Sequence, residues 1–376
     1  SFLEQLQSAS LELDAAPASA TDDCFWLYSS GTTGKPKGVV HSHRDMVVTS
    51  QHYGVDTLGV REEDVCFSAA KLFFAYGLGN AMSFPMSVGA TTVLFDGRPT
   101  PGSVMEILSK YKPTVFYGVP TLYAAILANT KYNRDSSSRR LRVAVSAGEP
   151  LPADLGRKWE ERFGCPILDG VGSTEMLHIY VSNSETELRY GTSGKPVPGY
   201  EIRLVDEQGT DIPDGEVGEM LVKGTTMAEG YWNRRAKTLS TFVGPWMWTG
   251  DKYIRREDGF YQYAGRTDDM FKSGGNWVSP FDVESALIAH TDVLEAGVIP
   301  HEDESGNLKP KAFVVLKEGV LPSDDLSDAL KIHVRDRIEV WKYPRWIEFI
   351  GELPKTATGK VQRFKLREMD QGNSST

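Results

Sequence analysis

The side chains best suited to chemistry lie close together near the start of the chain. The stretch Tyr28–Gly38 holds four Ser or Thr hydroxyls, three glycines and two lysines in eleven residues. Glycines let backbone N–H groups approach an anion closely, and hydroxyls and lysines add donors and positive charge. This composition predicts a polyphosphate-binding loop, in preference to a mobile surface loop, because Ser/Thr, Gly and Lys alternate in order. It is not a Walker A loop, since Gly31 and Gly34 are three apart and Pro36 follows Lys35.

A second candidate is the acidic turn Asp169–Glu175, which follows the strand-like Cys165–Leu168. Its glycines would let a planar base or acyl group lie against the backbone. We expect Thr174 and Glu175 to begin a helix, where the helix dipole favours an acidic side chain, and Met176–Tyr180 to continue it. Taken alone, the pattern also fits a strand–turn–helix with a capping threonine.

The stretch Tyr28–Gly38 resembles the phosphate loop of the adenylate-forming superfamily, which contains acyl-CoA synthetases, peptide-synthetase adenylation domains and luciferases. Three later stretches resemble segments of the same superfamily: Ser146–Pro150 on the adenine side, Trp248–Asp251 at the ribose and Gly265–Lys272 between domains. Each alone also fits an ordinary turn or salt-bridged loop. The resemblance implies that ATP or AMP is bound by Ser29, Ser30, Gly31, Thr32, Thr33, Gly34, Lys37, Ala147, Gly148, Glu149, Asp169, Gly170, Val171, Gly172, Thr174, Asp251 and Arg266.

The resemblance also implies a catalytic set of Glu175, Thr33 and Lys360. Glu175 would hold Mg²⁺, which usually takes one or two carboxylates together with phosphate oxygens. Asp251 would hold the ribose, since two carboxylate oxygens suit two vicinal hydroxyls. A carboxylate that attacks a triphosphate brings two anions together, and a lysine that contacts both offsets their repulsion. The small domain that carries Lys360 would turn about a hinge at Asp268.

Substrate choice depends on two aromatic stretches, Lys71–Gly79 and Met176–Tyr180, which closely resemble benzoate–CoA ligases. An ordinary amphipathic core is the alternative interpretation. The resemblance implies a pocket lined by Ala75, Tyr76, Ala147, Gly172, His178 and Ile179. Small residues with aromatic walls suit a flat ring and leave no room for a long acyl chain. The residues that resemble a loop beside the coenzyme A tunnel, where a surface turn is an equally good interpretation, are Ser273, Gly274, Gly275 and Trp277.

Composition narrows the class of protein. The chain has 376 residues, of which 40% are hydrophobic and 24% charged, as expected for two globular domains. The net charge of −10 argues against a nucleic-acid partner, although clustered lysines can still bind a nucleotide. No apolar run could span a bilayer and no signal peptide opens the chain, so we expect no membrane partner and a cytoplasmic location. Cys24, Cys66 and Cys165 are widely spaced and are expected to be reduced thiols.

We expect an α/β fold in two domains, residues 1–267 and 268–376. Alternating strands and helices from Val39 to Ser182 predict a mainly parallel sheet, whose ligands bind at the carboxyl ends of the strands. Hairpin signals in residues 191–265 predict a small antiparallel β-barrel beside the layered sheets, and residues 269–376 predict a small, mobile α+β domain. The predicted strands are Cys24–Leu27, Val65–Ser68, Thr91–Phe95, Thr114–Tyr117, Leu141–Val145, Glu201–Val205, Glu219–Val222, Val293–Ile299, Lys311–Leu316 and Trp346–Ile350. The predicted helices are Ser103–Lys110, Pro120–Ala128, Pro152–Phe163, Pro280–His290 and Asp324–Val340.

The predicted reaction converts benzoate, ATP and coenzyme A to benzoyl-CoA, AMP and diphosphate through benzoyl-AMP. The aromatic acid, MgATP and coenzyme A are then small-molecule substrates, and we expect no tightly bound organic cofactor. Alternatives are a ligase for 4-hydroxybenzoate, 2-aminobenzoate or a heteroaromatic acid, or an inactive nucleotide-binding fragment. The resemblance covers essentially the whole chain and implies a further portion ahead of Ser1, so we expect the sequence to lack an N-terminal part. A monomer and a homodimer both remain open.

Overall fold

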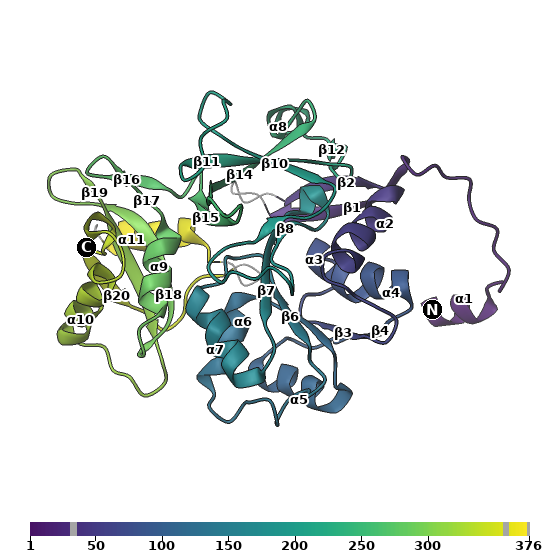
Figure 1. The fold of residues 1–376 in the computed structure, drawn as a ribbon, viewed down its shortest axis with the longest axis horizontal. Coiled ribbons are helices and arrows are strands. Elements are labelled where there is room, and N and C mark those ends of the chain that lie inside the picture. The colour runs from purple at the N-terminus through teal and green to yellow at the C-terminus, as the bar shows by residue number, and fades with distance from the viewer. Residues whose placement is uncertain (31–35, 356–360, 374–376) are drawn as a thin grey trace.

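The centre of the protein is a seven-stranded sheet. Its strands are β3 (Val65–Ser68), β4 (Thr91–Val93), β5 (Val115–Gly118), β6 (Val143–Ser146), β7 (Ile167–Gly172), β8 (Ile179–Ser182) and β9 (Lys195–Pro196). In the computed structural model, which describes residues 1–30, 36–355 and 361–373, they follow the order β4-β3-β5-β6-β7-β8-β9 (Figure 1). Strands β4 to β7 are parallel, and β8 and β9 each run antiparallel to the strand before them. The predicted α/β fold with a mainly parallel sheet is confirmed.

Helices cover both faces of this sheet. One face packs against α5 (Pro101–Tyr111), α6 (Pro120–Ala128) and α7 (Ala153–Phe163). Phe116 points to these helices and meets Trp159, whereas its neighbours Val115 and Tyr117 point to a second core on the opposite face. The segments on that side are α2 (His43–Thr49), η1 (Ser50–Val55), α3 (Ala75–Leu78), η2 (Gly79–Ser83) and α4 (Phe84–Val88). Strands that are buried on both faces form continuous apolar runs, which explains why these strands were predictable.

Two antiparallel sheets lie beside the central sheet. The first is β1 (Asp23–Ser30), β2 (Pro36–Ser42) and β12 (Gly230–Tyr231). The second is β10 (Tyr200–Val205), β11 (Val217–Gly224), β14 (Trp246–Arg255) and β13 (Phe242–Val243), with β15 (Tyr261–Arg266) paired to β14, and α8 (Arg235–Thr241) precedes β13. Met220 and Val222 of β11 join the second core of the central sheet. The predicted antiparallel region is therefore confirmed.

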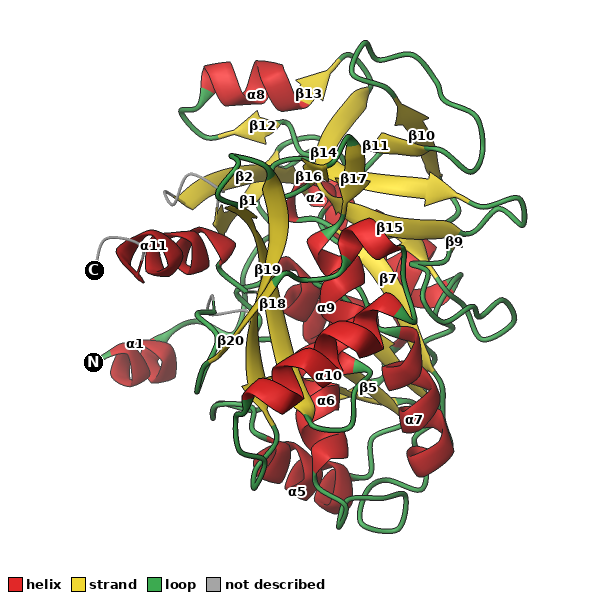
Figure 2. Cartoon of the chain, turned by 90° about the vertical axis from the view of Figure 1, so that its left-hand side faces the viewer, coloured by secondary structure: helices red, strands yellow, loops and turns green. Residues whose placement is uncertain are grey.

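The C-terminal part forms a separate α+β layer. Its elements are β16 (Phe271–Ser273), β17 (Asn276–Val278), α9 (Pro280–Ile288), β18 (Val293–Glu302), β19 (Leu308–Leu316), α10 (Asp324–Arg335), η4 (Val340–Lys342), β20 (Trp346–Phe349) and α11 (Arg363–Asn373). Helices α9 and α10 pack on one side of the β18–β19–β20 sheet, through Leu287 and Leu330, and α11 packs on the other side, through Leu366 (Figure 2). The small α+β unit is confirmed, and its boundary at 267/268 stays a prediction.

The N-terminal helix stands apart from these layers. Helix α1 (Phe2–Ser8) has no buried residue, and a long irregular segment joins it to β1 (Figure 1). Among the helices that the structure describes, none has the length and apolar character needed to cross a membrane.

Two expectations about local structure are wrong. Met176–Tyr180 does not continue a helix: η3 (Thr174–Met176) is a single 3-10 turn capped by Ser173, and Ile179 and Tyr180 belong to strand β8. The turn ends because Leu177 has φ +67°, outside helical backbone space, and the following β-branched and aromatic residues pair with β7. The predicted helix Asp324–Val340 is too long, because α10 ends at Arg335 and Val340 belongs to the separate turn η4, whereas the predicted strand at Cys24–Leu27 is confirmed as part of the longer β1.

Candidate active site

The predicted metal-binding carboxylate lies where three segments meet. Glu175 follows β7, Lys37 comes from β2 and Tyr231 from β12. The Tyr231 hydroxyl donates to Glu175 Oε1 at 2.8 Å, and Lys37 Nζ lies 3.2 Å from that hydroxyl and 3.5 Å from Glu175 Oε1. Burial and the Glu175 charge raise the pKa of Tyr231, so its hydroxyl keeps the proton that it donates. The structure thus brings together one predicted phosphate ligand and the predicted metal ligand.

Tyr231 is a site residue that the sequence did not indicate. It lies in the short run Gly230–Trp232, whose spacing resembles no phosphate or metal motif. Its place in the site comes from pairing of Tyr231 with Val39, which aligns β12 with the strand that follows the phosphate loop. A contact between segments so far apart in the chain leaves no local pattern.

The predicted ribose-binding pair lies on adjacent strands. Asp251 of β14 and Arg266 of β15 are partners in the β-ladder, and Arg266 Nη1 donates to Asp251 Oδ1 at 3.1 Å. The Asp251 charge raises the pKa of Arg266, which keeps the guanidinium charged. Thr249 fixes the segment, since its hydroxyl accepts from the Asp251 amide and donates to the Met220 carbonyl. One carboxylate and one guanidinium can together bind vicinal hydroxyls and a nearby phosphate.

The predicted adenine-side residues lie at the ends of two neighbouring strands. Ser146, which ends β6, pairs in register with Asp169 of β7. Ala147–Glu149 therefore leave the sheet beside Gly170–Gly172, which continue β7 and pair with β8. Gly148 has φ +92°, a conformation that favours glycine. Burial raises the pKa of Asp169 well above its ordinary range. This edge is the carboxyl end of the parallel strands, where such sheets bind ligands.

Rings gather around His178 in the predicted substrate region. His178 is 3% exposed, and its Nε2 lies 3.1 Å from Asn80 Oδ1 and 3.3 Å from the Tyr76 carbonyl. Its ring lies 5.6 Å from the Tyr76 ring and 4.6 Å from the Phe84 ring. Burial lowers the pKa of His178 to about 3, so the imidazole is neutral. Asn80 is a second residue that no motif indicated.

Tyr76 is fixed from the other side. Its hydroxyl donates to the carbonyls of Gly118 (3.2 Å) and Val145 (3.1 Å), at the carboxyl ends of β5 and β6. Ala75, the preceding residue, begins helix α3. The structure therefore places Tyr76 and His178 in contact. Ala75 and Ile179 are their neighbours in the chain, and Gly172 of β7 pairs with Ile179 of β8.

The residues proposed for the hinge and for coenzyme A lie farther along. Asp268 is exposed in the turn after β15. Gly274 and Gly275 form a tight turn with positive φ between β16 and β17, and buried Ser273 accepts from Lys309. Trp277 is 38% exposed and lies 5.3 Å from Lys252 Nζ, the neighbour of Asp251. Contacts within the described residues do not join this hairpin to Glu175.

Several predicted residues fall outside the described part of the chain: Gly31, Thr32, Thr33, Gly34 and Lys360. The strand ends beside them are placed. Ser29 and Ser30 close β1 and pair with Lys37 and Pro36, and Lys355 pairs with Val361 across the second gap. Roles for the five residues stay predictions.

Comparison with known proteins decides the family. Residues 2–232 match the AMP-binding enzyme family, and residues 282–360 match the AMP-binding enzyme C-terminal domain. The chain belongs to the AMP-binding enzymes. The predictions of an adenylate-forming protein and of an acid–thiol ligase are therefore confirmed.

Relatives of this AMP-binding enzyme include ligases for aromatic acids. It is 56% identical over 363 residues to a benzoate–CoA ligase of Thauera aromatica (96% of this chain, 69% of the relative). It is 54% identical over 372 residues to a 4-hydroxybenzoate–CoA/benzoate–CoA ligase of Rhodopseudomonas palustris (98% and 69%). The solved structure of the anthranilate CoA ligase AuaEII with anthranoyl-AMP matches with a TM-score of 0.97 at 47% identity, over 100% of this chain and 73% of that one.

Proposed function

We propose that this AMP-binding enzyme is a benzoate–CoA ligase that acts through benzoyl-AMP. In the first step a benzoate oxygen attacks the α-phosphorus of ATP, an O–P bond forms and diphosphate leaves. In the second step the coenzyme A thiolate attacks the acyl carbonyl, a thioester forms and AMP leaves. The thiol proton is released to solvent.

The observation that carries the proposal is the meeting of Lys37, Tyr231 and Glu175. A lysine, a phenolic hydroxyl and a carboxylate come from separate segments to one point beside the carboxyl end of β7. The Asp251–Arg266 pair supplies groups suited to a ribose and a phosphate. Together they provide groups suited to the phosphates, the metal ion and the ribose of a nucleoside triphosphate.

The residues present fit Mg²⁺ held mainly by its substrate. In the described chain no three His, Cys, Asp or Glu residues cluster as a metal cage. Glu175, whose side chain is 14% exposed, is a single carboxylate next to a phosphate-binding lysine. This matches the habit of Mg²⁺ of taking one or two carboxylates together with substrate phosphates. When bound, the ion would neutralise phosphate charge during the displacement.

The chain's own groups then do the positioning. Lys37 would hold a phosphate, Asp251 the ribose, and Arg266 a ribose or phosphate oxygen. Lys360 would bridge carboxylate and α-phosphate, offsetting repulsion between two anions. A turn of the small domain about Asp268 would afterwards withdraw that lysine and bring the hairpin of Gly274 and Gly275 to the thioester site.

The side chains of the predicted substrate region suit a flat aromatic acid. Neutral His178 and the rings of Tyr76 and Phe84 offer aromatic walls without a fixed charge. A 2-aminobenzoate ligase is the second candidate, because the structure with anthranoyl-AMP matches over the whole chain. A pyrophosphate-release assay with benzoate, 2-aminobenzoate and 4-hydroxybenzoate distinguishes a benzoate ligase from ligases for the two other acids. The highest kcat/KM for benzoate supports the proposal, and a higher value for either rival refutes that substrate.

Lys360→Ala tests the two-step scheme. Pyrophosphate release should fall by about 10²-fold or more, because the cation acts where charge develops, while conversion of supplied benzoyl-AMP to the thioester should change little. Lys355→Ala is the matched control, since this nearby lysine pairs with Glu295 instead. Equal loss in both half-reactions for Lys360→Ala would contradict the scheme.

A further inference from the structure

The turn that carries Glu175 is held in place by hydrogen bonds to its backbone carbonyls. Three successive carbonyls of η3 accept hydrogen bonds from donors outside the turn: Thr174 from His41 Nε2 (2.7 Å), Glu175 from the Ala228 amide (2.9 Å) and Met176 from the Thr226 hydroxyl (3.0 Å). We propose that His41, fixed by Asp45, and Thr226, fixed by Tyr200, are positioning residues that hold Glu175 in place for the metal–nucleotide. The proposal rests on the proposed function for the role of Glu175.

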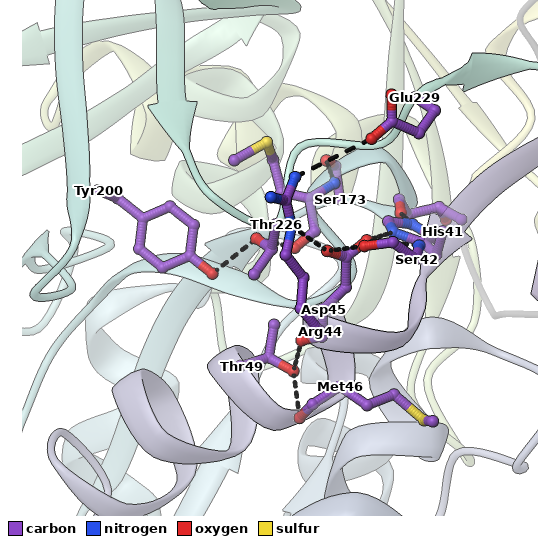
Figure 3. Close-up of polar contacts among 12 residues, drawn as sticks. His41, Ser42, Arg44, Asp45, Met46, Thr49, Ser173, Tyr200, Thr226 and Glu229 are labelled. Atoms are coloured by element: carbon purple, nitrogen blue, oxygen red, sulfur yellow. Dashed lines mark hydrogen bonds and ion pairs between the residues drawn. The ribbon is translucent and has the colours of Figure 1, made fainter. Parts of the chain in front are cut away.

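The histidine side of this backbone clamp, His41 with its partners, is a buried network of polar contacts (Figure 3). His41 is 0% and Asp45 1% exposed, and His41 Nδ1 lies 2.8 Å from Asp45 Oδ2. The amide and hydroxyl of Ser42 both donate to this carboxylate, and Arg44 Nε lies 3.7 Å away. The two donors of Ser42 therefore hold the Asp45 carboxylate, and its contact with Nδ1 fixes the ring orientation of His41.

Both atoms that face the His41 ring are acceptors. Asp45 offers a carboxylate oxygen to Nδ1, and the Thr174 carbonyl, which can only accept, takes its hydrogen bond from Nε2. His41 thus joins the segment after the phosphate loop to the turn that holds Glu175.

The threonine side reaches the turn from another segment. Thr226 is 0% exposed, and its hydroxyl donates to Met176 O. Its oxygen then accepts from the Tyr200 hydroxyl at 2.9 Å (Figure 3). The two arms of the clamp share no residue, so each can be removed alone.

The turn requires outside support. It contains only one 3-10 turn, and Leu177, which follows it, is a buried non-glycine residue at φ +67°. Such backbone is strained and persists only where surrounding contacts determine it. Without the clamp, Glu175 would keep its side-chain contacts to Tyr231 and Lys37 but lose its fixed backbone.

Hydrogen exchange tests the clamp without any activity measurement. We would compare amide exchange in peptides spanning residues 173–182 for the wild type, His41→Gln, His41→Leu and Thr226→Val. Loss of one buried hydrogen bond should speed exchange there about tenfold. Asp64→Asn is the control, because this buried carboxylate pairs with Arg142 at the amino end of β3, away from the site. It should leave exchange in 173–182 unchanged.

A second readout separates positioning from general damage. The Mg²⁺ concentration for half-maximal pyrophosphate release should rise about tenfold in His41→Gln and Thr226→Val, while thioester formation from supplied benzoyl-AMP is retained. Asp64→Asn should leave this Mg²⁺ concentration at the wild-type value. The proposal would be overturned if amide exchange in residues 173–182 stayed as slow as in the wild type in both His41→Gln and Thr226→Val. Equal losses in both half-reactions would also overturn it. If the wild type releases no pyrophosphate with any aromatic acid, the proposed function fails, while the exchange result still decides the clamp.

Discussion

Some residues of this site belong to a local sequence pattern that reveals them, and others do not. Glu175 and the Asp251–Arg266 pair stand in ordered motifs. Glu175 follows β7, and Arg266, which ends β15, contacts Asp251 of β14. Tyr231 and His41 reach the same region from segments far away in the chain. Sequence spacing reports only neighbours along the chain. The residues that hold a site through long-range contacts therefore could not be predicted.

His178 should make folding stability depend on pH. Burial lowers its pKa to about 3 from 6.5, so the folded protein keeps it neutral while the unfolded chain takes up a proton below pH 6.5. Stability from this group is complete above pH 6.5 and is lost as pH falls toward 3. Between pH 7 and pH 5 the loss should be about 2 kcal/mol.

Urea unfolding at pH 5, 6 and 7 measures that loss. In His178→Gln the difference in unfolding free energy from the wild type should shrink by about 2 kcal/mol between pH 7 and pH 5. His43→Gln removes an exposed histidine and should follow the wild-type pH dependence. Parallel curves for wild type and His178→Gln would show that His178 is not held neutral.

At the scale of helices and strands, the sequence predicted an element correctly where its apolar pattern agrees with residues, such as proline, that mark where the element begins or ends. Helix α6 begins at Pro120 and ends at Ala128 as expected, because proline suits the first helical turn. Prediction failed at residues 176–180, where a short apolar run fits a helix and a strand equally. The positive φ of Leu177 decides for a strand, and no residue type signals that conformation for leucine.

Gly172 should be needed for the β7–β8 pairing more than for pocket volume. A Cβ there would lie 2.5 Å from the His178 carbonyl oxygen, which is backbone and cannot turn aside. Gly172→Ala should therefore destabilise the protein by about 1–3 kcal/mol, as overpacking does. Thermal unfolding measures this, with Gly215→Ala as a comparison for glycine strain, since a Cβ at Gly215 meets no atom within 4 Å. An unchanged melting temperature for Gly172→Ala would show that β8 can move away.

At the scale of the whole molecule, the sequence indicated two units but not how they touch. Few described side chains meet across residue 267: Lys252 lies against Trp277, and the Tyr263 ring meets Phe281 at 5.5 Å. Of these four residues only Trp277 belongs to a stretch that the sequence singled out, and no motif indicated its partner. An interface of small separate contacts can rearrange at modest cost, which suits a domain that turns between two reaction steps.

Asp268→Pro should separate the two half-reactions. Asp268 lies exposed in the turn between β15 and β16, and proline fixes φ near −65° and also restricts Thr267. The present arrangement matches a solved acyl-adenylate complex over the whole chain, so the variant should retain adenylation. Thioester formation, which in the proposed scheme requires the small domain to turn, should fall on the order of tenfold or more. Stopped-flow assays of each half-reaction measure this, with Asp268→Ala as the control that leaves the backbone free to rotate. Thioester formation at the wild-type rate in Asp268→Pro would place the hinge elsewhere.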